Sequence, residues 1–218
     1  MAVASPHNKI INAVARAKLR PLGLQQKGRS RLWYDDRGWH AIVVEFQASS
    51  YSKMSYLHVS LSWFWYPSEL WTFDVGFRED GSAEFHDEQQ FRDDFERLSD
   101  EAIEAVRRYR RSFTSLQDAW TITSTLDEQN VSIVWPNVHL GLLAALNGNA
   151  EHARERLHFV VAEEVRTEWQ AAQRAFCEKA LDRIGDAGAL RSWIEDNIAA
   201  CREMRGLPTL EGPALPDR

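Results

Sequence analysis

The stretch SYLHVSLSWFW, residues 55–65, decides the fold class of this chain. Apolar residues alternate along it with small or polar ones. The apolar face carries Leu57, Val59, Leu61, Trp63 and Trp65, and the other face carries His58, Ser60 and Ser62. A period of two residues is typical of a β-strand with one buried face. The stretch therefore predicts a strand whose apolar side must be covered by another layer.

Neighbouring segments repeat this pattern. Residues 70–78 alternate in the same way, with Trp71, Phe73, Val75 and Phe77 expected inward, and a Glu-Asp-Gly turn is expected at residues 79–81. Residues 31–35 and 39–48 flank an Asp-Arg-Gly turn, where a glycine suits a positive φ. The sequence thus predicts four strands paired as an antiparallel meander.

Helices are expected on both sides of the meander. Residues 6–20 form the first predicted helix, which Pro21 ends. Residues 87–113 carry one continuous apolar stripe, so they predict a long helix that covers the sheet. Acidic residues at its start and arginines at its end suit the helix dipole. These arginines could in addition form a binding site, and the sequence leaves this alternative open.

The composition changes after residue 115, where strand signals disappear. We expect an α+β domain over 1–115, an all-helical region over 116–206 and a flexible, Pro/Gly-rich tail over 207–218. Residues 138–161 look like one tetratricopeptide-type helical hairpin. Because repeat proteins need about three such units, we interpret the hairpin as local packing.

Composition narrows the classes of function. The chain of 218 residues is 44% hydrophobic and 27% charged, with a formal charge of −6, which is ordinary for a globular protein. The first 37 residues are basic, so this segment could meet nucleic acid or an acidic partner. The acidic whole makes nucleic acid the less expected partner. No apolar run reaches about 18 residues and no signal peptide is evident, so we expect no membrane segment and a cytoplasmic location.

The sequence offers little chemistry. No phosphate loop, GxSxG, HExxH or paired CxxC motif occurs. Neither a catalytic residue, a metal site nor a cofactor is therefore predicted, and whether the chain is an enzyme stays open. One alternative is an acid–base or metal cluster of His40 and His58 with Glu45 or Asp74. Cys177 is a weaker candidate for a nucleophile.

The best candidate for recognition is the polar segment 47–53, which joins two predicted strands. Loops on a rigid scaffold often carry function. A plain hairpin connection is the simpler interpretation. The residues that we assign to binding are Gln47, Ser49, Ser50, Tyr51 and Lys53 of the segment, His58 on the next strand, and the basic Arg29 and Arg31.

Six short blocks in order carry a family resemblance. They are PLGL (21–24), KGRSR (27–31), WY (33–34), VEFQ (44–47), SSYSK (49–53) and YLHV (56–59). In these blocks, residues 7–115 resemble the bacterial domain-of-unknown-function family numbered 4304. The resemblance implies a small cytoplasmic bacterial α+β protein, in some cases encoded near toxin–immunity or defence genes, and it implies no catalytic residues.

These observations favour a non-catalytic bacterial protein-binding module, of immunity or inhibitor type, that acts on a basic partner. The alternative is an enzyme or nucleic-acid-processing accessory that uses the basic N-terminal segment with His40, His58 and Glu45. A third alternative is a homo-oligomer that assembles through the C-terminal helices.

Overall fold

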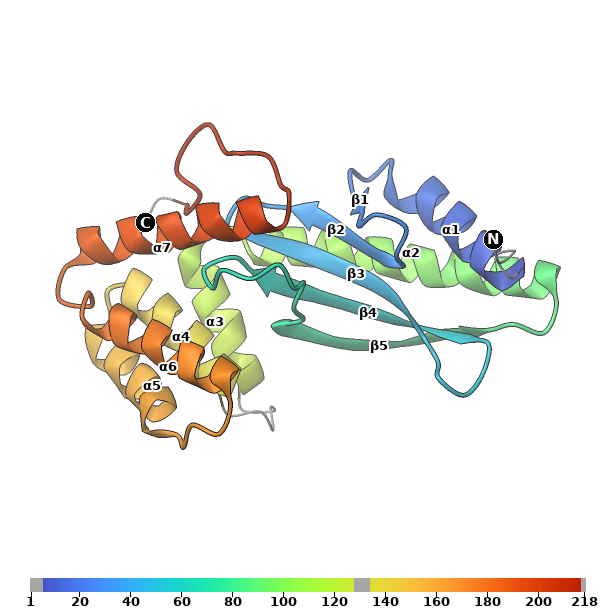
Figure 1. The fold of residues 1–218 in the computed structure, drawn as a ribbon. Coiled ribbons are helices and arrows are strands. Elements are labelled where there is room, and N and C mark those ends of the chain that lie inside the picture. Colours follow the sequence, from blue (N-terminus) through green and yellow to red (C-terminus); the bar gives the residue numbers. More distant parts are fainter. Residues whose placement is uncertain (1–5, 128–133, 217–218) are drawn as a thin grey trace. The chain divides into compact units, whose positions relative to one another are not determined.

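The computed structural model describes residues 6–127 and 134–216 and shows an α+β fold (Figure 1). The chain divides into two compact units. The first comprises the residues up to Trp63 together with Leu70–Arg111, and the second comprises Phe64–Glu69 with the residues from Ser112 onward. The sequence pattern predicts residues 64–69 in the first domain, whereas their contacts group them with the helices.

The first unit contains an antiparallel meander. Its strands are β1 (Gln25–Gln26), β2 (Leu32–Asp36), β3 (His40–Ala48), β4 (Met54–Trp63) and β5 (Val75–Glu84). Within the described residues the sheet has five strands in the order β1-β2-β3-β4-β5. The predicted meander is therefore confirmed, with β1 as a two-residue addition at one edge. Gly38, in the turn between β2 and β3, has the positive φ of 86° that such a turn favours.

Two helices cover one face of the sheet: α1 (Pro6–Leu19) and α2 (Glu88–Ser112). The Phe95 ring of α2 lies 4.6 Å from the Phe46 ring of β3, and both side chains are fully buried. The helices also touch each other, since Lys18 of α1 pairs with Asp100 of α2 at 2.7 Å. The apolar stripe predicted for the long helix thus meets the apolar face of the sheet.

The last strand differs from the prediction. It begins at Val75 and continues through residues 79–81, where a turn is expected. The register pairs Tyr56 with Ser82 and His58 with Arg78, so residues 79–81 form a bulge opposite Leu57. A glycine suits a bulge as well as a turn, so the sequence pattern places the end of this strand at residue 78 instead of residue 84.

Residues 70–74 form no strand and lie against the face that α1 and α2 leave open. Trp71 packs 4.4 Å from the Tyr34 ring, and Thr72 hydrogen-bonds Ser62 at 2.9 Å. Asp74 accepts hydrogen bonds from the Trp63 amide and from the Thr72 hydroxyl. The prediction that Trp71 and Phe73 point into the core is wrong, because both are half-exposed on this face.

The second unit is helical. It contains α3 (Leu116–Asp127), α4 (Val134–Leu146), α5 (Ala150–Ala162), α6 (Glu168–Leu181) and α7 (Ala187–Met204). Side chains of Asn149, Thr167 and Asp186 cap α5, α6 and α7. Segment 64–69 joins this unit through Trp65, whose indole N–H donates a 3.0 Å hydrogen bond to His139 Nδ1.

Residues 207–216, which we call the strap, fold back over α7 instead of extending as a loose tail. Gly206 ends α7 with a φ of 68°, and the Leu207 amide bonds the Arg202 carbonyl at 2.9 Å. Leu207 and Leu215 are both buried. Residues 217–218 of the predicted tail lie outside the described residues.

Candidate functional site

The tip of the β3–β4 hairpin, residues 49–53, is an ordered turn. Ser49 Oγ accepts hydrogen bonds from the amides of Tyr51 (3.1 Å) and Ser52 (3.2 Å). This serine turn is a common way to satisfy loop amides. It leaves Tyr51 completely exposed and Ser50 exposed beside it. The tip therefore presents an aromatic side chain at the end of the sheet, as a recognition loop would.

Two of the predicted basic residues, Arg31 and Lys53, lie at this end of the sheet. Arg31 donates to Ser55 Oγ at 3.1 Å and to Asn8 Oδ1 of α1. Lys53 Nζ lies 5.5 Å from the centre of the Phe85 ring. Burial, together with the charges of Arg31 and Lys53, lowers the pKa of His7. The positive charges of both residues thus converge on His7, at the first turn of α1.

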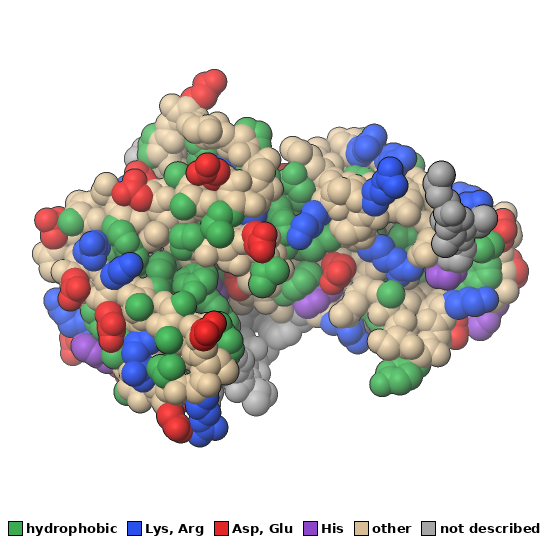
Figure 2. All heavy atoms as spheres, viewed as in Figure 1, with side chains coloured by type: hydrophobic (Ala, Val, Ile, Leu, Met, Phe, Trp, Pro, Cys, Tyr) green, Lys and Arg blue, Asp and Glu red, His purple; other side chains and the backbone are tan. Residues whose placement is uncertain are grey.

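Arg29 lies exposed in the turn at residues 28–30, between β1 and β2. Figure 2 shows Lys and Arg side chains gathered around α1 and the loop that follows it, in keeping with the basic first segment of the sequence. Among the described residues, Arg29 makes no contact with Arg31 or Lys53. Of the three basic candidates, Arg31 and Lys53 therefore lie at the hairpin end of the sheet, and Arg29 lies apart from them.

The open face of the sheet carries the other candidates. Cross-strand pairing places Glu45, His58 and Arg78 in one row. Phe73 stacks on the His58 ring at 4.3 Å with 19° between the ring planes. Burial and the nearby Arg78 charge lower the pKa of His58, so its imidazole is neutral at pH 7. Burial raises the pKa of Glu45, against the lowering effect of Arg31.

Gln47 belongs to a cluster beside this row. The Arg78 guanidinium lies 4.4 Å from the centre of the Tyr56 ring and donates a hydrogen bond to Gln47 Oε1. Gln47 and Tyr56 are direct cross-strand partners, so the three side chains share one face. The arrangement offers half-exposed aromatic and polar groups of the kind that anchors protein interfaces.

His40 and His58 do not form the acid–base or metal cluster that is one alternative from the sequence. His40 pairs with Trp63, and His58 pairs with Glu45, five residues further along β3. An odd separation along a strand puts the two histidines on opposite faces of the sheet. Among the described residues no hydrogen bond links His58 to Glu45, and no group of three potential metal ligands occurs. The hypothesis of a shared acid–base or metal centre at these histidines is wrong.

Both cysteines are buried, and neither forms a disulfide in the described part of the chain. Burial raises the pKa of Cys177 to about 12, with a smaller contribution from Glu178. A thiol attacks as its thiolate, so Cys177 is protonated and unreactive at neutral pH. The structure thus offers no support for Cys177 as a nucleophile.

An acidic surface lies where β5 meets α2, and we define it by Asp80, Glu84, Asp87 and Glu101. The Gln90 amide joins the two elements, because it donates to the Glu84 carbonyl at 3.0 Å and to Asp94 of its own helix. Glu101 lies against β5, since a Cβ added at Gly81 would come within 2.0 Å of its Oε2. The helix dipole accounts for acidic residues at the start of α2, but no local sequence pattern marks the acidic residues of β5 as part of the same surface.

Few cations compensate this surface. Two ion pairs form nearby in the described part of the chain, and neither includes a residue of the acidic surface. Arg97 pairs with Asp94, and Arg108 pairs with Glu79. Glu84 lies 3.7 Å from His86, and Lys53 lies beside the next residue, Phe85, whose amide bonds the Lys53 carbonyl at 3.0 Å. Asp80, Asp87 and Glu101 are exposed. The four carboxylates therefore present net negative charge to solvent.

Comparison of the chain with protein-family models gave no match, and comparisons with curated proteins and with solved structures gave no match either. The resemblance to family 4304 therefore stays a prediction. Over the described residues, every helix is too short or too polar to span a lipid bilayer.

Proposed function

We propose that this protein is a non-catalytic protein-binding module that captures a basic partner, in the manner of an immunity or inhibitor protein. The acidic surface of Asp80, Glu84, Asp87 and Glu101 carries the proposal. Its carboxylates come from β5, from α2 and from the residue before α2, and Asp80, Asp87 and Glu101 form no ion pair among the described residues. Complementary charge speeds association and selects partners of opposite sign.

Two further observations support a binding role without chemistry. The open sheet face and the hairpin tip expose aromatic groups, and Tyr51 is wholly exposed. The titratable candidates of the sheet, His58 and Glu45, share no hydrogen bond among the described residues, so they do not form the preassembled pair of a base-activated nucleophile. The setting of immunity proteins enters through the resemblance to family 4304.

The test compares two variants of equal charge. In the first, the acidic surface is neutralised by Asp80→Asn, Glu84→Gln, Asp87→Asn and Glu101→Gln. Asn at position 87 still caps α2, whose Gln90 amide bonds Asp87 Oδ1 at 2.9 Å. The control neutralises four exposed acids of the helical unit by Glu151→Gln, Glu163→Gln, Glu178→Gln and Asp182→Asn. Both variants have a formal charge of −2 instead of −6.

Tagged wild type and both variants are used to capture proteins from the native host, with elution at rising salt. We expect one stoichiometric basic protein to bind wild type and the control variant and to be released by salt. The surface variant should retain about a tenth of it or less. Equal capture by all three proteins, or capture of an acidic protein, contradicts the proposal.

We propose, second, that a phosphate backbone binds at the hairpin end, because Arg31 hydrogen-bonds Ser55 and Lys53 lies over the Phe85 ring there. Under this proposal, Arg31→Gln and Lys53→Gln each weaken binding of a single-stranded oligonucleotide and reduce its salt dependence. Binding that is unchanged in both variants, or undetectable in wild type, rules it out.

A further inference from the structure

The strap contains the dipeptide Leu-Pro twice, at residues 207–208 and 215–216, and the rest of the sequence does not contain it. Both copies dock on α7 in the same way. Leu207 and Leu215 are buried, whereas residues 211–213 between them are exposed. A repeated dipeptide with a repeated mode of docking indicates two equivalent subsites on the helix.

One arginine of α7 holds each copy of the dipeptide. Arg202 donates to the Pro208 carbonyl through Nε (3.2 Å) and Nη2 (2.8 Å). Arg191 Nη2 donates to the carbonyls of Leu215 and Pro216, both at 2.9 Å. Each subsite therefore takes a leucine side chain and the main-chain carbonyl of the proline that follows it. Main-chain hydrogen bonds combined with pockets for selected side chains are a common basis of peptide recognition.

The two subsites lie closer together than the two Leu-Pro pairs do along the strap. Arg191 and Arg202 are eleven residues apart, which is about three helical turns, so they share one face of α7 and lie about 16 Å apart along it. The Leu-Pro pairs are eight residues apart, a span of about 25 Å in the extended conformation that proline favours. The strap therefore bows away from the helix between its two fixed ends.

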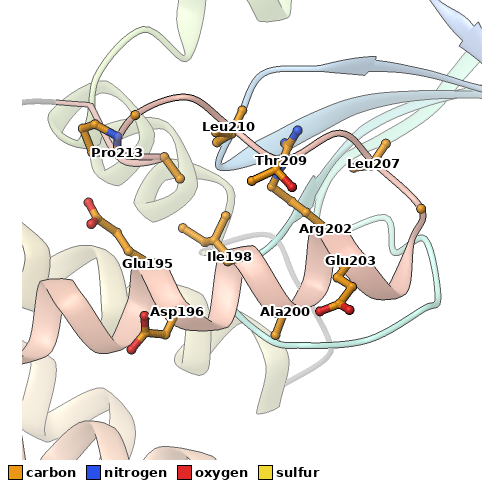
Figure 3. Close-up of a pocket in the computed structure, with 14 residues that line it drawn as sticks. Glu195, Asp196, Ile198, Ala200, Arg202, Glu203, Leu207, Thr209, Leu210 and Pro213 are labelled. Atoms are coloured by element: carbon orange, nitrogen blue, oxygen red, sulfur yellow. The ribbon is translucent and has the colours of Figure 1, made fainter.

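A hollow of about 900 Å³ lies where the strap bows, with walls from residues 195–203 of α7 and from residues 206–214. Figure 3 shows Ile198 and Arg202 pointing from the helix toward the strap, with Leu210 and Pro213 across from them. The middle of the strap thus loses conformational freedom, which costs free energy for each ordered residue, without filling the space beneath it. The strap is consequently an imperfect occupant of the two subsites.

We propose that this face of α7 is a docking groove for an extended segment of a partner protein that carries two Leu-Pro pairs about five residues apart. Five residues of polyproline helix span about 16 Å, so such a segment reaches both subsites without a bow. The strap acts as an intramolecular cover, which the partner segment displaces. The groove lies in the helical unit, so the proposal is independent of the capture of a basic partner by the first unit.

The probe is the peptide Leu-Pro-Pro-Ala-Pro-Leu-Pro, capped at both ends and titrated into the full chain by calorimetry. Leu215→Ala weakens the strap and leaves α7 unchanged. We expect this variant to bind the probe at least about tenfold more tightly than wild type, because the groove is open in a larger fraction of the molecules. Leu207→Ala should act in the same way.

Two further peptides test what the groove selects. One is the probe with alanine in place of both leucines, and the other is a capped peptide of residues 207–216, in which the Leu-Pro pairs are eight residues apart. Both should bind Leu215→Ala at least about tenfold more weakly than the probe does.

A second substitution tests one subsite. In the Leu215→Ala background, Arg191→Gln should raise the Kd of the probe about tenfold or more. The control is Arg183→Gln, which should change the Kd less than about twofold, because the Arg183 guanidinium lies over the Trp193 ring and does not line the hollow. Amide chemical shifts of residues 187–204 check that α7 is intact in each variant. The shifts of residues 207–216 should move toward those of a disordered chain when the probe binds.

Five outcomes overturn the proposal. These are no binding of the probe at millimolar concentration by either strap variant, equally tight binding by wild type, equal binding of either comparison peptide, and an unchanged Kd after Arg191→Gln with α7 intact. The fifth is a dimer of wild type, measured by light scattering, that Leu215→Ala dissociates, since it would assign the groove to the strap of a second copy.

Discussion

Arg110 Nε donates a 2.8 Å hydrogen bond to Asp35 Oδ2, joining the last turns of α2 to the sheet. The same guanidinium donates to the Leu22 carbonyl, at 2.8 Å, in the loop after α1. One side chain thus ties three segments of the first unit together. Among the arginines that end α2, Arg107 and Arg108 pair with Glu104 and Glu79. Most of this cluster therefore serves internal ion pairs and is not left open for a ligand.

Loss of the Asp35 carboxylate should destabilise the first unit strongly. Asp35 is 8% exposed, and removal of one partner of a buried ion pair leaves the other charge uncompensated. We expect Asp35→Ala to lower the free energy of unfolding by about 3 kcal/mol, measured by urea denaturation.

The control for this change is Asp100→Ala. Asp100 pairs with Lys18 at 2.7 Å but is 57% exposed, so its loss should cost less than about 1 kcal/mol. Equal effects of the two substitutions would show that the Arg110–Asp35 bond does not anchor α2.

Stability should also depend on pH through His40. This side chain lies buried between the rings of Trp39 (4.6 Å) and Trp63 (5.6 Å). Burial, with a smaller effect of Arg37, lowers its pKa to about 3 from 6.5. Between these values the unfolded chain binds a proton that the folded chain does not. The stability is therefore fully present above pH 6.5 and is lost as the pH falls toward 3.

The measurement is the free energy of unfolding of wild type and His40→Asn at pH 7 and pH 5. We expect wild type to lose about 2 kcal/mol more than the variant over this interval, since the limit is about 1.4 kcal/mol per pH unit below 6.5. His86→Asn is the control substitution, because His86 is 68% exposed and lies outside the buried contact of Trp39 and Trp63. Parallel curves for wild type and His40→Asn would refute the assignment.

Helices α4 and α5 pack so closely at Gly141 that a larger side chain there should destabilise the helical unit. A Cβ added at Gly141 would lie 2.7 Å from Leu157 Cγ, which is fully buried. Alanine gains about 1 kcal/mol of helix propensity over glycine, while forced overpacking costs about 1–3 kcal/mol. We expect Gly141→Ala to be destabilising by about 1 kcal/mol in thermal or urea unfolding.

A double-mutant cycle identifies the cause. Leu157→Ala removes the obstructing side chain, so Gly141→Ala should become neutral or stabilising in that background. Gly185→Ala is the control, because an added Cβ meets nothing within 4 Å there. If the cost of Gly141→Ala is the same in both backgrounds, Leu157 is not the constraint.

The sequence predicts correctly the helices and strands in which the apolar pattern continues over many residues. The stripe of α2 and the alternation of β4 come from burial on one side only, and that signal survives in a single sequence. It fails at residues 70–84, where Trp71 and Phe73 alternate like strand residues but pack on the open face through Tyr34 and His58. Local pattern cannot tell which face of a sheet an aromatic side chain will meet.

The candidate sites also divide into those that a local sequence pattern predicts and those that depend on tertiary contacts. The hairpin tip with Tyr51 and the basic pair of Arg31 and Lys53 come from turn chemistry and local charge, which a sequence displays directly. The acidic surface joins residues 80–84 to residues 87–101 through the bulge of β5, and the hollow depends on Arg191 and Arg202 reaching the strap. Both need tertiary contacts that no local pattern encodes.

Segment 64–69 has a consequence for how the protein can be divided. Phe64 and Trp65 are fully buried, Trp65 is held by His139, and Arg205 lies 4.8 Å from the Phe64 ring. Yet the segment precedes every helix of its own unit along the chain. A cut after residue 111 therefore gives one fragment with an orphaned aromatic loop and another with an unfilled interior. During synthesis the loop leaves the ribosome before the helices that enclose it, so β4 and β5 can pair while their connection still awaits its partners.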